Sequence, residues 1–337
     1  MHGSSSFFAI GCCSALLAVA CRRGSVDGPP GADGRAAEAA SAAGSFSPET
    51  PQTGEAPRKD AALDADSFFT LLTGRPVRAK SIGHTSYVLK VTLEGGRVAV
   101  FKPRSNRPLG GWRYKGEIAA YRLAVALGLD NVLPAIPHAF KGDDLRALTE
   151  SFDAMGRIDA DGHVRGALMP WLDTYRVLPL EEPTWRARWE PWVMDERAPV
   201  PQDELARAGA ISTMIAFDYL TANWDRWSGG NVAEDSATGK VLFVDNDGAF
   251  YDPPDAAALK QEVALVRRVA RFSRRFVAAL RALDPTKLAS AIGDELPGTP
   301  LLPPRVLDGV DARRRTVLAV VDARAGDAGE GVTMFFE

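Results

Sequence analysis

The chain has 337 residues, of which 46% are hydrophobic and 25% are charged, and its formal net charge is -3. This composition is typical of a globular protein with one two-lobed domain or two small ones, and it gives no electrostatic case for nucleic acid as a partner. The three cysteines, Cys12, Cys13 and Cys21, all precede Arg22. The rest of the chain therefore has neither a disulfide nor a thiolate metal site.

The N-terminus has the pattern of an export signal. An uninterrupted run of apolar and small residues extends over 7–20, which suits a signal peptide and is short for a membrane span. Small residues directly precede Cys21, so residues 1–21 resemble a bacterial lipoprotein signal in which that cysteine is lipidated. No Lys or Arg precedes the run, and Ala18 stands where such signals usually have Leu, so a plain signal peptide or an apolar tail is the alternative. We expect an exported lipoprotein in the periplasm or cell envelope, whose contact with a membrane is through this anchor alone.

Residues 22–60 are rich in Ala, Gly, Ser and Pro and have no sustained apolar period. Such a segment cannot bury enough surface to offset its ordering entropy, so we expect a disordered tether. Folded structure is predicted from residue 61, with Asp64 capping a first helix that ends at Gly74.

Two strands are predicted next, over 87–93 and 97–102, joined by a glycine turn. Alternate side chains of a strand share a face, so Val98, Val100 and Lys102 point the same way. A largely buried helix is predicted over 116–127, and its charged residues are Glu117 and Arg122.

Further along, the pattern becomes mainly helical. A hydrophobic segment spans 166–171, and a tryptophan-bearing stretch over 185–192 has no clear assignment. A long helix is predicted from Asp203 to Thr221, and the later elements are a hairpin (231–234 against 240–244) and a helical run over 256–283. Strands followed by helices indicate an α+β protein with two lobes, a β-rich one over 61–170 and a mostly helical one over 171–337.

Two charged residues stand out in the first lobe. Lys102 ends a strand on its inward face, where burial is costly without a partner. Glu117 begins an otherwise apolar helix. Each has an ordinary explanation alone, as a lysine that reaches solvent and as a favourable charge at a helix start. Together they form a candidate Lys–Glu pair of the kind that holds ATP phosphates.

Two loops in the second lobe add carboxylates. In Asn223-Trp224-Asp225-Arg226, Asp225 can accept the proton of an attacking hydroxyl, and Asn231 can coordinate a metal. An apolar strand runs into Asp245-Asn246-Asp247-Gly248, where carboxylate oxygens suit Mg²⁺ or Mn²⁺. Polar turns are the alternative explanation for both loops.

The order of these motifs, over about 81–250, resembles the atypical kinases of the secretory pathway. That group includes the Golgi casein kinase and four-jointed families, with HipA-type and phosphoinositide kinases as more distant relatives. The resemblance implies a protein-kinase-like fold in which Lys102 contacts phosphates and Glu117 orients Lys102 or helps to hold metal. It also implies Asp225 as the general base and places Asn231 and Asp245 on the metal.

The chain departs from that pattern at several positions. The loop that contains Gly83 would cover the phosphates without a Gly-x-Gly-x-x-Gly pattern, and Trp227 stands where many relatives have His. The interval from Asp225 to Asn231 is one residue longer than the usual kinase loop. Asp247 is an extra carboxylate that could share or replace the metal role of Asp245.

The sequence thus predicts an ATP-dependent, metal-assisted phosphotransferase, with Val98, Val100 and Met169 lining the adenine pocket. Its acceptor would be a protein Ser/Thr hydroxyl by analogy, with a sugar or a lipid head group also open. Two alternatives keep the fold: a catalytically inactive binding module and a nucleotidyl transferase.

Overall fold

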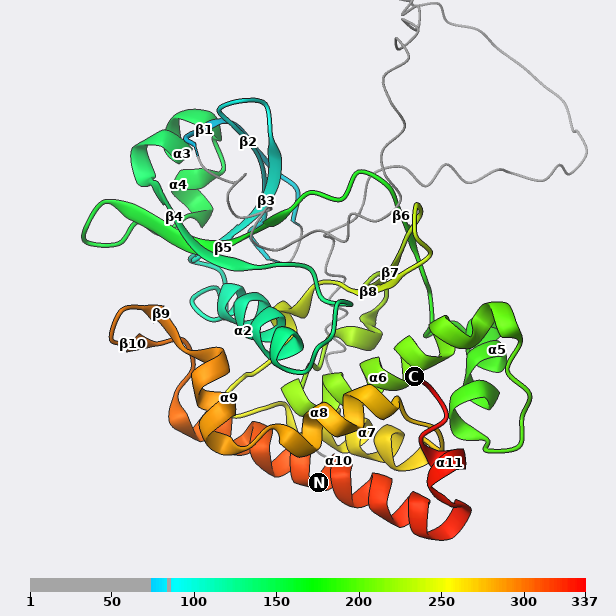
Figure 1. The fold of residues 1–337 in the computed structure, drawn as a ribbon. Helices are drawn as coiled ribbons and strands as arrows, with labels where there is room; N and C mark the ends of the chain where they lie inside the picture. The colour runs from blue at the N-terminus through cyan, green and yellow to red at the C-terminus, as the bar shows by residue number, and fades with distance from the viewer. Residues whose placement is uncertain (1–73, 84–85) are drawn as a thin grey trace, which may run out of the picture.

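The computed structural model describes residues 74–83 and 86–337. The predicted signal peptide, the tether and the helix that starts at Asp64 lie outside the described residues. The described part of the chain forms a β-rich lobe and a helical lobe (Figure 1). This is the α+β, two-lobed architecture that the sequence predicted.

A five-stranded antiparallel sheet forms the first lobe, in the order β1-β2-β3-β5-β4. Strands β2 and β3 are the two predicted strands, and β5 contains the hydrophobic segment at 166–170. The two edge strands were not predicted. The strand bounds are β1 (Pro76–Ser81), β2 (Leu89–Leu93), β3 (Val98–Pro103), β4 (Ile136–Lys141) and β5 (His163–Pro170).

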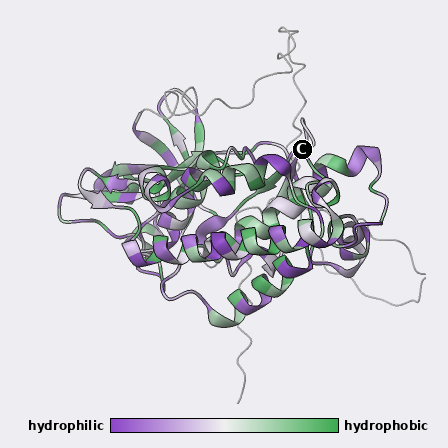
Figure 2. Cartoon of the chain, turned by 60° about the horizontal axis from the view of Figure 1, so that its bottom comes forward, coloured by the Kyte–Doolittle hydropathy of each residue, from purple (hydrophilic) through white to green (hydrophobic). Residues whose placement is uncertain are grey.

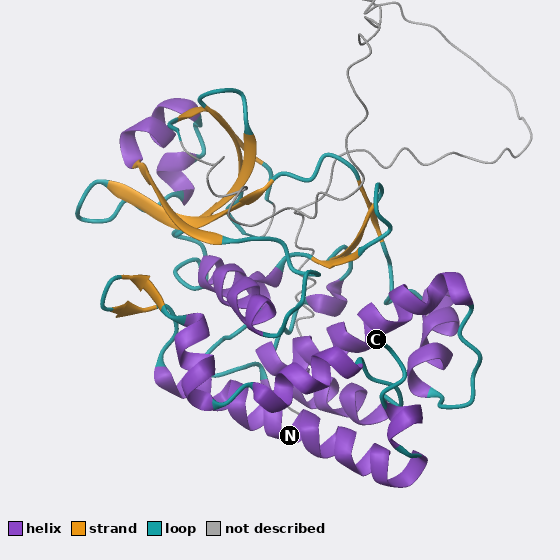
Figure 3. Ribbon diagram, in the orientation of Figure 1, coloured by secondary structure: helices purple, strands orange, loops and turns teal. Residues whose placement is uncertain are grey.

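The two faces of this sheet bury different partners. One face packs on the short helices α3 (Gly142–Leu148) and α4 (Phe152–Met155), where Phe101 and Phe140 meet edge to face at 4.8 Å. Helix α2 (Arg113–Ala126) contacts β3 and β5 and also the helical lobe. Helix α2 therefore lies between the sheet and the helical lobe (Figure 3).

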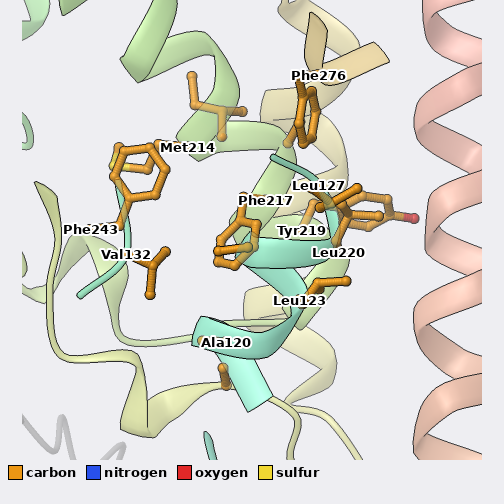
Figure 4. Packing of buried hydrophobic residues seen from close by; sticks show 14 of the residues in the cluster. Ala120, Leu123, Leu127, Val132, Met214, Phe217, Tyr219, Leu220, Phe243 and Phe276 are labelled. Carbon is orange, nitrogen blue, oxygen red and sulfur yellow. The ribbon is translucent and has the colours of Figure 1, made fainter. Parts of the chain in front are cut away.

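The second lobe is built around α6. Figure 4 shows Phe217 and Leu220 of this helix in one buried cluster with Leu123 of α2 and with Leu127, which follows α2. Green and purple segments alternate along individual helices in Figure 2, as expected for helices that bury one face. The helix bounds are α5 (Pro183–Met194), α6 (Leu205–Thr221), α7 (Ala256–Arg268), α8 (Arg274–Ala282), α9 (Pro285–Ile292), α10 (Pro304–Ala328) and α11 (Glu330–Thr333).

Two smaller β elements complete the lobe. The strands β6 (Tyr175–Val177), β7 (Val232–Asp235) and β8 (Val241–Phe243) form a three-stranded antiparallel sheet, and β7 and β8 are the predicted hairpin. A hairpin of β9 (Asp294–Leu296) and β10 (Thr299–Pro300) lies apart from it. No helix in residues 74–83 or 86–337 has the length and apolar character needed to cross a membrane.

The predicted helical run over 256–283 is wrong in one respect, because it is two helices. The chain between α7 and α8 is extended, and Arg271 there donates to the carbonyls of Trp192 and Glu196 at 3.2 and 2.7 Å. Ser273 then caps α8 by accepting from the backbone N–H of Phe276. Tertiary hydrogen bonds thus replace helical ones at this break.

Candidate functional site

Lys102 lies at the centre of the buried charges between the lobes. Strand β3 brings its side chain to the inward face, where 2% of the residue is exposed. Its Nζ donates to Glu117 Oε1 at 2.5 Å, to Asp245 Oδ1 at 2.5 Å and to Asp247 Oδ2 at 3.1 Å. A buried ammonium requires partners of this kind, and three carboxylates supply them.

The loop after β8 presents these carboxylates through an unusual backbone conformation. Asp245 has φ 53°, in the left-handed region, and a single turn of 3-10 helix, η3 (Asn246–Gly248), follows it. The backbone N–H of Asn246 donates to Glu117 Oε2 at 3.1 Å. Glu117 therefore contacts Lys102 with one oxygen and this loop with the other, and so fixes their relative positions.

Gly116 allows α2 to come this close to the loop. A Cβ added at Gly116 would lie 2.7 Å from the carbonyl oxygen of Asn246 and 3.2 Å from that of Ala249. Such contacts are too short for any other residue unless the backbone shifts. The glycine immediately before Glu117 is therefore a packing requirement of the site.

The electrostatics of the cluster follow from its charge count. Three carboxylates, Glu117, Asp245 and Asp247, face two cations, Lys102 and Arg113, whose Nη1 lies 2.8 Å from Asp247 Oδ1. Burial alone would lower the pKa of Lys102, but its three carboxylate partners outweigh burial and raise that pKa. The cluster as a whole keeps one excess negative charge.

The two aspartates of the loop differ in character. Burial, together with the nearby carboxylates, raises the pKa of Asp245, and Lys102 offsets this only in part. Burial alone would also raise the pKa of Asp247, but Lys102 and Arg113 outweigh it and lower that pKa. Asp247 is thus satisfied by cations on both oxygens, whereas Asp245 is the carboxylate that an added cation would stabilise most.

Asp225 lies in the loop after α6, fully buried, against the same carboxylate loop. A Cβ added at Gly248 would lie 2.8 Å from Asp225 Cβ, so the two loops touch there. The carbonyl of Asp225 accepts from Ser228 Oγ and from Asn231 Nδ2, each at 2.8 Å. The carbonyl group of Asp225 is therefore held in place.

Arg226 lies between these segments and is 1% exposed. Its guanidinium pairs with Asp218 of α6 at 3.0 Å and donates to Asn246 Oδ1 at 2.6 Å. It also donates to the carbonyls of Asn231 and Val244, each at 2.5 Å. One buried arginine thus ties the helix, the Asp225 loop and the Asp245 loop together.

Two buried oxygens near the cluster are available to a divalent metal. Asn231 Oδ1 and Asp245 Oδ2 are buried and have no hydrogen-bond partner within the described residues. Within that same part of the chain, no three His, Cys, Asp or Glu side chains are arranged to hold a metal, since Lys102 occupies the centre of the carboxylates. The two orphaned oxygens fit a Mg²⁺ or Mn²⁺ ion, for which oxygen is the preferred ligand.

An apolar pocket opens beside the charged cluster. Val100 and Met169 pair across β3 and β5 and form part of its wall, with Trp171 following β5 and Asp245 at its end. Lys90 lies over the Trp171 ring at 3.6 Å. The pocket is mostly apolar, and Glu117 and Asp245 of the ion cluster are among its lining residues.

The structure brings together most of the residues that the sequence singled out. Lys102, Glu117, Asp245 and Asp247 form one cluster, and Asp225 and Asn231 lie in the loop against it. Val98 is not among the described residues that line the apolar pocket. The catalytic and metal-binding roles of the clustered residues stay predictions.

Gly83 lies in the predicted phosphate loop. A Cβ there would be 2.1 Å from the carbonyl oxygen of Ser86, so only glycine fits this bend. The intervening positions 84–85 are outside the described residues, and the role of the loop stays a prediction.

Sequence reasoning missed two charged residues of the site, Arg113 and Arg226. Arg113 precedes Glu117 by four residues, a spacing that puts both side chains on one face of a helix, and this was an available signal. Arg226 had the signal of an arginine next to the proposed base, but nothing in the sequence indicated its five hydrogen bonds.

No family model and no curated protein matches the chain. Solved structures do match: the crystal structure of the Golgi casein kinase has 14% sequence identity and a TM-score of 0.58, over 79% of this chain and 77% of that one. The same kinase with Mn/ADP bound gives the same values. The structure of hydra Fam20 with sugar has 17% identity and a TM-score of 0.54, over 81% of this chain and 93% of that one. The chain therefore has the kinase-like fold of these proteins.

Proposed function

We propose that the protein is an ATP-dependent phosphotransferase that moves the γ-phosphoryl group of ATP to a hydroxyl acceptor with the help of Mg²⁺ or Mn²⁺. The observation that carries the proposal is the buried ion cluster around Lys102. A fold alone would not require three carboxylates and two cations to be buried together, because burying charges is costly.

The proposed roles follow from the geometry. Lys102 would bind the phosphates, and Glu117 would hold Lys102 and the Asp245 loop in register. Asp245 and Asn231 have the orphaned oxygens that suit a metal, which supplies charge neutralisation at the transferring phosphoryl group. The apolar pocket of Val100 and Met169 would take the base.

Catalysis on this site would rest on positioning and on electrostatic stabilisation. The acceptor hydroxyl attacks the γ-phosphorus, its proton passes to Asp225, and ADP leaves as the bond to the β-phosphate oxygen breaks. Asp225 can serve because its backbone is fixed by Ser228 and Asn231. Arg226 keeps that loop against the Asp245 loop.

The first choice of acceptor is a protein Ser or Thr hydroxyl, in line with the Golgi casein kinase that shares the fold. The related structure of hydra Fam20 contains a sugar, so a sugar is the second choice. The export signal proposed from the sequence would put the reaction outside the cytoplasm, on a lipid-anchored protein.

The test is phosphoryl transfer from γ-labelled ATP by the full chain, with Mg²⁺ or Mn²⁺, to panels of protein and sugar acceptors. Asp225→Asn keeps the size of the side chain and removes the base, so transfer should fall by at least 10²-fold. Ser236→Ala, on an exposed turn, is the matched control and should be unchanged.

Two results would contradict the proposal. Asp225→Asn with full activity would exclude Asp225 as the base. Nucleotide binding without transfer to any acceptor would favour an inactive binding module, and a nucleotidyl mass on the product would favour nucleotidyl transfer.

A further inference from the structure

Three hydrogen-bond donors of Trp112, Arg113 and Tyr251 are buried and have no acceptor within the described residues. They are Arg113 Nε, the indole Nε1 of Trp112 and the hydroxyl of Tyr251, and none of them has a hydrogen-bond partner in residues 74–83 or 86–337. A buried donor without a partner costs about 1–3 kcal/mol, so three in one place need an explanation.

The three donors come from two segments that the fold brings together. Trp112 and Arg113 begin α2, one turn before Glu117, and Tyr251 follows η3 by three residues. The rings of Trp112 and Tyr251 lie 6.4 Å apart at an interplanar angle of 31°. The next ring along is that of Trp224, 6.5 Å from Tyr251 and adjacent in the chain to Asp225.

The charged groups that affect the pKa of Tyr251 belong to the ion cluster and include the proposed base. Burial raises the pKa of Tyr251; Arg113 and Lys102 lower it, and Asp247 and Asp225 raise it. The hydroxyl thus lies within electrostatic reach of both the ion cluster and the proposed base.

Arg113 is the cation of the cluster that lies next to Tyr251. Asp247 accepts from Lys102 with one oxygen and from Arg113 with the other, so the two cations flank a single carboxylate. Lys102 belongs to the part of the cluster next to the base pocket, where Glu117 and Asp245 lie. Arg113 belongs to the part next to Tyr251, and its side chain is 11% exposed.

We propose that Arg113, Tyr251 and Trp112 form a subsite for the terminal phosphoryl group of a nucleoside triphosphate. A terminal phosphate has three non-bridging oxygens, which supply the acceptors that the three donors lack, and Arg113 adds a charge-assisted hydrogen bond. In this arrangement Asp247 orients Arg113 and is not itself a metal ligand. This inference rests on the proposed function, because it assigns part of the same nucleotide site.

The subsite makes the protein discriminate between triphosphate and diphosphate. The test is calorimetric titration of the full chain, in Mg²⁺, with ADP and with the non-hydrolysable β,γ-imido analogue of ATP. Arg113→Met should lower the affinity for the analogue at least tenfold, or about 1.4 kcal/mol. It should change the affinity for ADP less than threefold. Tyr251→Phe and Trp112→Phe, which change no charge, should weaken the analogue alone by a smaller factor.

Two further variants guard against trivial explanations. Arg113→Met leaves Asp247 with one cation fewer, so the double variant Arg113→Met/Asp247→Asn restores the charge balance and should still lose affinity for the analogue alone. Arg78→Met, at an exposed position of β1, is the matched control and should bind both nucleotides like the wild type.

Each outcome decides the question. An equal loss of affinity for ADP and for the analogue would show that Arg113 acts only through Asp247, and it would overturn the proposed subsite. Unchanged affinities in all three single variants would do the same, while leaving the proposed function intact. A wild-type protein that binds neither nucleotide would overturn the proposed function, and the subsite with it.

Discussion

Replacing Asp245 with Asn should make the metal-free protein more stable, although it removes a residue of the proposed active site. The ion cluster has three carboxylates and two cations, and the pKa of Asp245 is raised from 3.8 to about 7. An ionised Asp245 therefore destabilises the fold in the absence of a further cation. Asparagine has nearly the same shape and no charge, and it tolerates the left-handed conformation found at this position.

The magnitude follows from the pKa shift. Each pKa unit corresponds to about 1.4 kcal/mol, so the upper bound is about 4 kcal/mol. Relaxation of Lys102 toward its two other partners reduces this, and a gain of about 2 kcal/mol is expected. For a fold of this size that is a rise of about 4–8 °C in Tm.

The assay is thermal unfolding of wild type and Asp245→Asn at pH 8 with a chelator present, followed by the same scans with ATP and Mn²⁺. At about 100 times Kd a ligand adds about 2.7 kcal/mol. The wild type should gain this from the nucleotide and the variant should not. A variant that is less stable than the wild type without metal would refute the idea that the cluster holds excess negative charge.

Two further substitutions test the packing of α2 against the Asp245 loop and the protonation of a buried acid in the second lobe. Gly116→Ala should lower the free energy of unfolding by about 1–2 kcal/mol, because the added methyl would meet the carbonyl of Asn246; Gly111→Ala, with open space around its Cβ, is the control, and equal effects in denaturant unfolding would contradict this. Burial, with Asp218 nearby, raises the pKa of Glu262 to about 9, and the cations Arg313 and Arg226 offset this only in part. The folded state then holds a proton that the unfolded state releases above about pH 4.3, so stability should fall as pH rises from there toward 9, by up to about 1.4 kcal/mol per unit. Glu262→Gln should flatten that slope in urea titrations between pH 5 and 9, and an unchanged slope would rule out Glu262 as its source.

The sequence predicted the lobes and much of the cluster because their signals are local. Alternating apolar residues marked β2 and β3, and the order of Lys102, Glu117 and Asp245 along the chain was informative once each was placed on an element. The edge strands β1 and β4 carry weaker alternation. Their assignment depends on neighbours that are distant in the sequence.

Other features depend on tertiary contacts that no window of sequence contains. The stretch that begins at Trp185 is helix α5, and it is anchored by Trp189, whose indole N–H donates to the carbonyl of Leu180 at 2.9 Å. The break before α8 is fixed by Arg271 and by the backbone N–H of Phe272, which donates to the carbonyl of Thr333. Residues more than 50 positions apart meet there, so local helical propensity was overridden.

The charged site was likewise only partly visible. The sequence suggested a Lys–Glu pair, whereas the structure shows Lys102 shared among three carboxylates and Arg113 on the far side of Asp247. The sequence pattern of a carboxylate in a polar turn is the same whether the carboxylate contacts water or a buried arginine. Only the fold distinguishes the two cases.

The proposed function requires the site around Lys102 and Asp245 to bind ATP together with a divalent metal. Its most direct test is calorimetric titration of the full chain with ATP in Mn²⁺, in Mg²⁺ and in a chelator, for wild type and Asp245→Asn. We expect one site per chain in either metal, and a loss of at least tenfold in affinity both in the chelator and in Asp245→Asn. Binding that ignores the metal and the substitution, or no binding at all, would contradict it.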